Sequence, residues 1–259
     1  MFGDTFTLMR EGQAWIEGRY EGLYPLPFVM VMSILARLRV EVVIIGVLVA
    51  SVILCVVLLK REALLWIMYL PILETLALGQ LSIIWLFLMR VGTGLSFALM
   101  TLKPQLFFFA IPVLAARREM WRPFGMWCGA LYFPALVVRP TWPVEWLQHI
   151  FDDSRITGGT SASLWPVPIL AFVFASVLLL TRRYSWRSIF TSFNPVLRPY
   201  DYTIWAGSNR WLIPLSWVLG LTMAGVQAAW PMAFVGIAAT LLDKHRIESW
   251  QRVRSPQAS

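Results

Sequence analysis

Long apolar blocks constrain this chain more than any other feature of its sequence. In the clearest block, residues 40–59, the only charged side chain is Glu41. A helix needs about 20 such residues to cross the hydrocarbon core of a bilayer, which is roughly 30 Å thick. Charged residues make up only 14% of the chain, whereas a soluble domain carries about a quarter. We therefore expect an integral membrane protein that lies largely within a lipid bilayer.

Apolar blocks recur along most of the chain and predict an all-α fold, since a helix satisfies its backbone hydrogen bonds within one segment. We expect a polytopic transmembrane helical bundle of about nine spans. The expected division is an external N-terminal loop (1–22), a transmembrane helical domain (23–243) and a basic cytoplasmic tail (244–259). The spans are expected at residues 23–36, 40–59, 63–89 (broken near Pro71 and Gly79), 91–102, 104–116, 123–138, 163–181, 211–228 and 230–242.

The positions of Lys and Arg predict an orientation in the cell's inner (plasma) membrane. With the C-terminus in the cytoplasm, most basic residues fall on the cytoplasmic side, as the positive-inside rule requires. Residues 1–22 and the loop 139–163 are then outside. The basic residues expected inside are Arg37, Arg39, Arg90, Arg117, Arg118, Arg122, Arg182, Arg183, Arg187, Lys244, Arg246, Arg252 and Arg254, and those expected outside are Arg10, Arg19, Lys60, Arg61, Arg139 and Arg155. Because basic residues gather at span ends, the net charge of +8 indicates contact with anionic lipid rather than nucleic acid.

Two breaks in the apolar pattern predict a cavity. One lies at Gly79, and the other at Lys103-Pro104-Gln105, between the blocks 91–102 and 104–116. Non-helical backbone at membrane depth is tolerated only where it is buried in protein or lines a wet cavity. We therefore expect short broken helices around a cavity that opens to the outer face. Lys103 could bind a phosphate there as a point charge or extend to the interface, and the sequence leaves both readings open.

Further polar residues in apolar surroundings are candidates for function, because ionisable groups are costly within a membrane. Gln80, near Glu74, can form a hydrogen bond between helices. The segment 194–202 contains two prolines, which favour a non-helical connection. Within it, Arg198 either pairs with Asp201 or binds the phosphate of a ligand.

The sequence predicts no metal site and no cofactor. Cys55 and Cys128 lack the spacing of metal ligands. His149 and His245 stand in a loop and in the tail, and neither receives a role. Asp4 is either an ordinary residue of a solvated segment or a carboxylate that accepts a proton from a hydroxyl group.

Five short segments, taken in order, resemble the family-87 glycosyltransferases, polytopic enzymes of the GT-C class that include bacterial α-mannosyltransferases. The segments are Gly3-Asp4, Gly22-Leu23-Tyr24-Pro25-Leu26, Leu78-Gly79-Gln80-Leu81-Ser82, Leu102-Lys103-Pro104-Gln105-Leu106 and Pro199-Tyr200-Asp201. Together they extend over most of the chain.

The resemblance implies an enzyme that transfers a sugar, such as mannose, from a polyprenyl-phosphate donor to an acceptor hydroxyl on the outer face. Asp4 matches the acidic residue of the first external loop that serves as the base in such enzymes. Our own inference adds Lys103 or Arg198 as the cation that offsets charge on the departing phosphate. The full set expected to bind the donor is Lys103, Gln105, Arg198, Tyr200, Asp201 and Gln80.

The chain departs from the family at its start, because a transmembrane helix normally precedes the external loop and this sequence begins almost at Gly3-Asp4. Three explanations are open: the start is mis-assigned, a membrane-protein partner supplies the helix, or the protein is a degenerate relative. Whether the enzyme is active is therefore left open by the sequence. The alternative functions are a non-catalytic GT-C-like membrane subunit of a larger assembly and a transporter of lipid or a small solute.

Overall fold

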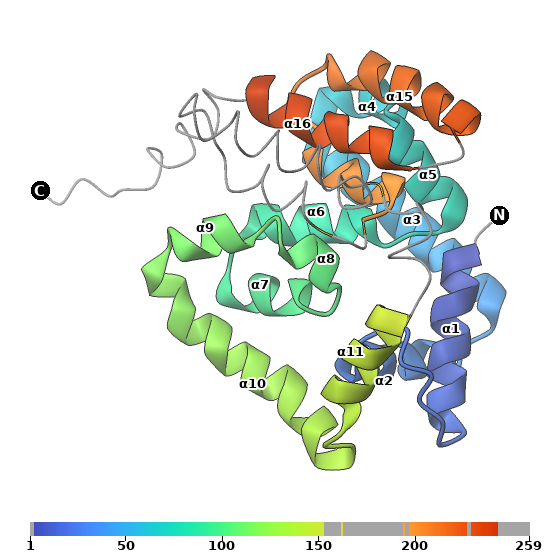
Figure 1. Cartoon of the computed structure of the whole chain (residues 1–259), viewed down its shortest axis with the longest axis vertical. Coiled ribbons are helices and arrows are strands. Elements are labelled where there is room, and N and C mark those ends of the chain that lie inside the picture. The colour runs from blue at the N-terminus through green and yellow to red at the C-terminus, as the bar shows by residue number, and fades with distance from the viewer. Residues whose placement is uncertain (1–2, 153–161, 163–193, 195–196, 227–228, 243–259) are drawn as a thin grey trace, which may run out of the picture.

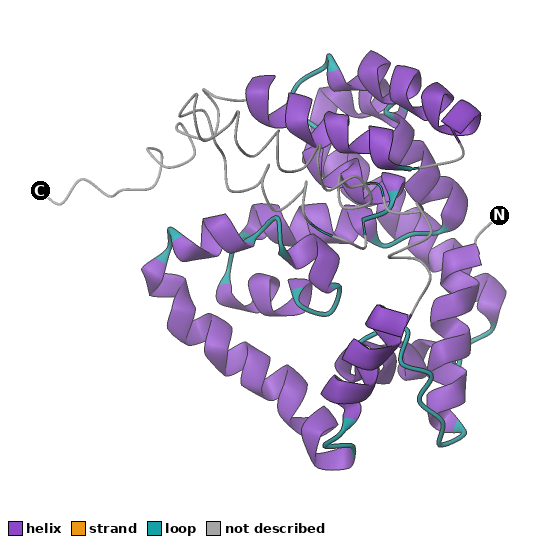
Figure 2. Ribbon diagram, viewed as in Figure 1, coloured by secondary structure: helices purple, strands orange, loops and turns teal. Residues whose placement is uncertain are grey.

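The computed structural model describes residues 3–152, 162, 194, 197–226 and 229–242. Every regular element in these residues is helical, as expected for an all-α fold (Figure 2). The α-helices are α1 (Gly3–Ile16), α2 (Leu26–Leu35), α3 (Val40–Leu59), α4 (Ala63–Ile67), α5 (Leu70–Leu78), α6 (Ser82–Val91), α7 (Gly94–Met100), α8 (Pro104–Phe107), α9 (Ile111–Ala115), α10 (Trp121–Val138), α11 (Trp142–Asp152), α15 (Leu212–Val226) and α16 (Ala233–Leu242). The 3-10 helices are η1 (Lys60–Glu62), η2 (Arg118–Met120), η3 (Pro199–Trp205) and η4 (Trp230–Met232).

The length and the exposed apolar surface of helix α3 indicate that the protein is associated with a membrane. Its 20 residues extend over about 30 Å, and the helical stretch continues through η1 and α4 to Ile67. Only 22% of its most apolar window is buried, and side chains such as Ile45, at 60% exposure, face outward. The core helix of a soluble protein would bury such residues, whereas a helix in lipid exposes them without cost.

The predicted break at Gly79 is present as a sharp bend. Helices α5 and α6 are apolar enough together to form one span, but the chain bends by 118° between them. Gly79 ends α5 in the left-handed conformation, with φ of 66°, which glycine adopts without the steric cost of a side chain. Pro71 stands in the first turn of α5, so the predicted span 63–89 is divided at both expected places.

The nine expected spans are not confirmed in the part of the chain that the structure describes. Among the residues that the structure describes, one helix is long and apolar enough to cross a membrane, or two if the bent α5–α6 pair counts as one span. The predicted spans 91–102 and 104–116 are instead the short helices α7, α8 and α9, of seven, four and five residues. Threonine, lysine and proline residues at 101–104 interrupt the helical pattern there. The predicted span 163–181 and the tail 244–259 lie outside the described residues.

The N-terminal region is helical where a loop was predicted. Residues Gly3–Ile16 form α1, which packs along α2 (Figure 1). The contact is close at Gly12, where a Cβ atom would lie 2.7 Å from the backbone carbonyl carbon of Met32. Amphipathic spacing in 3–16 was the missed signal, since Thr5, Leu8, Glu11 and Gly12 face inward.

The predicted orientation also needs correction at its first span. The predicted span 23–36 contains α2, which has ten residues and therefore measures about 15 Å, half of the hydrocarbon thickness. Arg10 and Arg19 also line one cavity with Leu38 and Val40. The expected separation of Arg10 and Arg19 from Arg37 and Arg39 by a membrane is therefore wrong, because both groups lie at the N-terminal end of α3.

We expect Gly12→Ala to destabilise the protein by about 1–3 kcal/mol, because the new methyl group forces α1 away from α2. Thermal unfolding in detergent measures the change. Gly46→Ala is the matched control, since a Cβ at Gly46 meets no atom within 4 Å. Equal unfolding temperatures for the two variants would contradict the close packing of α1 on α2.

Candidate functional site

A buried ion pair lies at the centre of the candidate site. The ammonium Nζ of Lys103 is 2.8 Å from Oδ1 of Asp201, and their side chains are 6% and 0% exposed. Lys103 directly precedes α8 and Asp201 lies in η3, so the pair joins segments that are 98 residues apart. Each charge is compensated by the other, which is the condition for keeping ions in a buried environment.

Three further groups surround this pair. The backbone N–H of Arg198 donates to Oδ2 of Asp201 at 3.0 Å, and the Ser82 hydroxyl donates to Oδ1 at a longer 3.5 Å. The Lys103 ammonium also lies 5.0 Å from the centre of the Tyr200 ring, within the range of a cation–π interaction. The carboxylate of Asp201 thus accepts from three segments of the chain.

Hydrogen bonds to α5 fix the segment that carries Asp201. The Thr203 hydroxyl donates to the carbonyl of Pro71 at 2.9 Å and lies 2.9 Å from the Thr75 hydroxyl. The Tyr69 hydroxyl donates to the carbonyl of Tyr202 at 3.0 Å. Since Pro71 and Pro199 each lack a backbone N–H, side-chain hydroxyls supply much of the polar contact between these elements.

The start of α1 reaches the same region. The Thr5 hydroxyl donates to the carbonyl of Gly79 at 2.7 Å, in a buried contact, and Asp4 is the preceding residue in the first turn of α1. Gln80 is buried at the bend, and its backbone N–H donates to the carbonyl of Thr75 at 2.8 Å. The bend therefore connects α1 with the segment that follows α5.

The segment Gly22–Leu26 is linked to α6 by edge-to-face aromatic contacts through Phe28 of α2. Tyr24 packs edge-on against Phe28, and Phe28 against Trp85 of α6. The Tyr20 hydroxyl donates to the carbonyl of Tyr24 at 2.7 Å, and burial raises the pKa of Tyr20 above its usual value. This arrangement holds residues 20–28 against the helices that carry the bend.

The predicted site residues are brought together to different degrees. Lys103, Tyr200 and Asp201 are in direct contact. Arg198 contacts Asp201 through its backbone N–H. The ion pair of the Asp201 carboxylate is with Lys103 and not with Arg198, the pair that was one of two readings of the sequence. Gln105 takes part through its carbonyl, which accepts from the Asn194 side chain at 2.8 Å.

These contacts do not test the role predicted for Asp4, but they change the role predicted for Lys103. Asp4 lies at the start of α1, near the bend, and its catalytic role stays a prediction. Lys103 neither extends to an interface nor carries an uncompensated charge, because Asp201 holds its ammonium. Sequence reasoning assigned no role to Ser82, Thr75 or Thr203, since hydroxyl residues in apolar helices give no distinctive pattern.

Glu74 adds a second carboxylate to this region. It has an electrostatic interaction with Asp201, and its Oε2 atom is buried with no hydrogen-bond partner. Among the described residues, no group of three or more His, Cys, Asp or Glu side chains is arranged to hold a metal ion.

Comparison with known proteins identifies no relative. No family model, no curated protein and no solved structure matches the chain.

Removing one partner of the Lys103–Asp201 pair should destabilise the protein by about 3–5 kcal/mol, because it leaves an uncompensated buried charge. We expect this of Lys103→Met and of Asp201→Asn, and a smaller loss for the double variant than the sum of the two. Unfolding in detergent measures the coupling.

The matched control for this cycle is the exposed pair of Arg210 and Glu62, whose side chains are 68% and 44% exposed. Arg210→Gln should cost less than about 1 kcal/mol. Additive losses at Lys103 and Asp201 would mean that the two side chains do not interact.

Proposed function

We propose that this protein is a membrane glycosyltransferase of the GT-C type, which transfers a sugar from a polyprenyl phosphate to an acceptor hydroxyl on the outer face. One observation carries the proposal. The segments that resemble family-87 glycosyltransferases are far apart in the sequence, yet contacts link them around the bend between α5 and α6. Segments that only stabilised separate helices would have no reason to meet at one place.

In this proposal, the Asp4 carboxylate is the general base. It accepts the proton of the acceptor hydroxyl while the acceptor oxygen bonds to the anomeric carbon, and the bond from that carbon to the donor phosphate breaks. We assign the Arg198 guanidinium to the departing phosphate, because the Lys103 ammonium is held by Asp201. Tyr200, Gln105 and Gln80 are the other members of the proposed donor-binding set.

The distribution of charges supports an orientation with α1 outside. At the C-terminal end of α3, Arg90 donates to the carbonyl of Leu58 and Arg210 pairs with Glu62. Among the residues that the structure describes, the basic residues of this end are Lys60, Arg61, Arg90, Arg117, Arg118, Arg122 and Arg210, and those of the N-terminal end are Arg10, Arg19, Arg37, Arg39 and Arg139. Since Lys and Arg are more abundant at the first end, we assign it to the cytoplasm. This proposal reverses the sides expected from the sequence for Arg37 and Arg39 and for Lys60 and Arg61.

Helix α10 fits the same two-ended arrangement. It begins beside η2 at the basic end and ends at Arg139, whose guanidinium lies 5.4 Å from the centre of the Tyr20 ring. In this proposal α10 therefore extends from the basic end back to the N-terminal end of α3, beside the membrane-crossing α3. Large apolar side chains of α10 are exposed, among them Met126 and Phe133, as expected of a helix in contact with lipid.

This orientation is tested by labelling with a membrane-impermeant maleimide in intact cells, after Cys55 and Cys128 are replaced by alanine. We expect Arg39→Cys to be labelled from outside and Arg61→Cys only after permeabilisation. The two variants control for each other, because both introduce one exposed thiol at an end of α3. The reverse pattern would contradict the orientation.

The catalytic assignment is tested by sugar transfer from polyprenyl-phosphate mannose in proteoliposomes. Asp4→Asn should lower the rate at least about 100-fold, since general base catalysis contributes on that order. Glu41→Gln removes an exposed carboxylate at the N-terminal end of α3 and should leave the rate unchanged. Equal rates for Asp4→Asn and the unmodified protein would exclude Asp4 as the base.

A second candidate function is a non-catalytic membrane subunit that retains this fold. The favouring observation is the Lys103–Asp201 pair itself, which is almost fully buried and internally neutral, as a purely structural link would be. A subunit of this kind predicts no transfer by the purified chain and recovery of transfer when a membrane-protein partner copurifies.

A further inference from the structure

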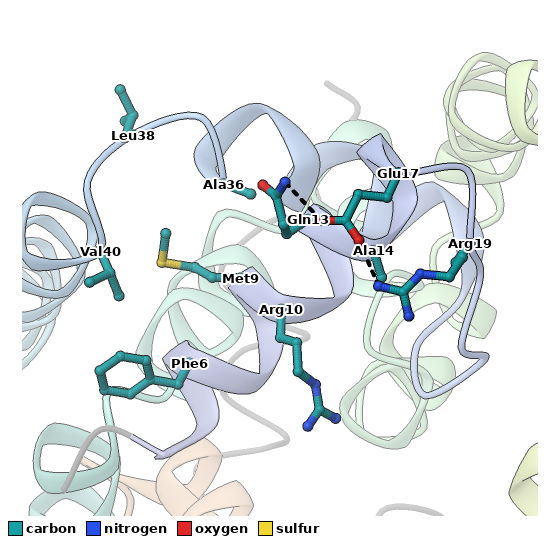
Figure 3. Close-up of a pocket in the computed structure, with 10 residues that line it drawn as sticks. All are labelled: Phe6, Met9, Arg10, Gln13, Ala14, Glu17, Arg19, Ala36, Leu38 and Val40. Carbon is teal, nitrogen blue, oxygen red and sulfur yellow. Dashed lines mark hydrogen bonds and ion pairs between the residues drawn. The ribbon is translucent and has the colours of Figure 1, made fainter.

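A shallow cavity of about 500 Å³, largely open to the surface, lies beside α1 and the turn that connects α2 to α3. Phe6, Met9, Leu38 and Val40 form one side, which is apolar (Figure 3). The volume falls within the range of small-molecule sites in proteins. An apolar wall of this kind is complementary to a hydrocarbon chain.

The other side of the cavity is polar and carries both signs of charge. Arg10 and Gln13 of α1 and Glu17, which directly follows it, line this side. Figure 3 shows Gln13 and Arg19 in contact with the Glu17 carboxylate. Arg10 is 66% exposed and makes only a long contact of 3.6 Å with Glu21. Since a guanidinium has five N–H donors, Arg10 retains donors for an anion.

The cavity lies where the apolar part of α3 begins. Val40 is the first residue of α3 and also lines the cavity, while Arg39 precedes it and is exposed. Beyond this point the outward side chains of α3 are apolar, as at Val42 and Ile45. The polar wall therefore lies near the level of lipid headgroups and the apolar wall near the start of the acyl chains.

We propose that this cavity binds a phospholipid whose headgroup carries a phosphate and a primary ammonium, as in phosphatidylethanolamine. Arg10 binds the phosphate, the Glu17 carboxylate accepts hydrogen bonds from the ammonium, and the first part of an acyl chain packs on Phe6, Met9 and Leu38. The inference rests on the membrane location proposed above, but it does not depend on sugar transfer.

Charge balance selects this headgroup over the alternatives. Glu17 and Glu21 offset the charges of Arg10 and Arg19, so a lipid with only a negative headgroup would meet repulsion from Glu17. A quaternary ammonium has no N–H to donate to that carboxylate, which disfavours phosphatidylcholine. A headgroup with both a phosphate and a primary ammonium matches both charges on the polar side of the cavity, Arg10 and Glu17.

The experiment is native mass spectrometry of the full chain in detergent, with phosphatidylethanolamine, phosphatidylglycerol and phosphatidylcholine of identical acyl chains. We expect phosphatidylethanolamine to bind about tenfold more tightly than the other two, the effect of one charge-assisted contact. Arg10→Gln should weaken the binding of all three lipids, because each carries the phosphate that Arg10 binds. Glu17→Gln should weaken phosphatidylethanolamine and strengthen phosphatidylglycerol.

Arg61→Gln is the matched control, because it removes an exposed arginine from the opposite end of α3 and should leave the binding of all three lipids intact. Soluble phosphoethanolamine should bind at least tenfold more weakly than the lipid, since it lacks the acyl chain. Equal binding of all three lipids, tighter binding of phosphatidylglycerol, or an equal effect of Arg61→Gln would overturn the proposal. Because binding is measured without donor or acceptor, failure here is separate from failure of the transferase assay.

Discussion

The contact between Lys103 and Asp201 is the interaction on which the centre of this structure depends. It closes the distance between the turn before α8 and the 3-10 helix η3, and both side chains are almost fully buried. Hydroxyl groups of α5 then hold the residues on either side of Asp201. A buried ion pair seldom adds net stability over an apolar pair, but it penalises arrangements that leave one charge alone. Its main contribution here is to specify which segments meet.

The bend at Gly79 brings both α5 and α6 into contact with η3. A straight α5–α6 helix would separate Thr75 from Ser82 along its axis, whereas the 118° bend allows both residues to contact η3. The same bend exposes the Gly79 carbonyl, which accepts from Thr5 of α1. Backbone groups released by a break at membrane depth need partners, and here the partner comes from the segment that contains Asp4.

The sequence could predict the apolar character, the helical class and the break at Gly79, because these depend on local composition. It also indicated that Lys103 needs a partner, but not which one, since Asp201 is 98 residues away. The nine spans are not confirmed among the described residues, because apolar composition does not determine helix length, as α7, α8 and α9 show. The orientation failed at α2 for the same reason, since ten residues cannot separate two sets of arginines.

The central claim is that segments scattered through the chain meet at the bend between α5 and α6. Oxidative cross-linking of Thr5→Cys with Gln80→Cys in native membranes, with Cys55 and Cys128 replaced by alanine, tests it most directly. The account predicts rapid formation of an intramolecular disulfide. Thr7→Cys with Gln80→Cys is the control and should react slowly, because residue 7 lies on another face of α1. Slow reaction of the first pair, at the rate of the control, would contradict the account.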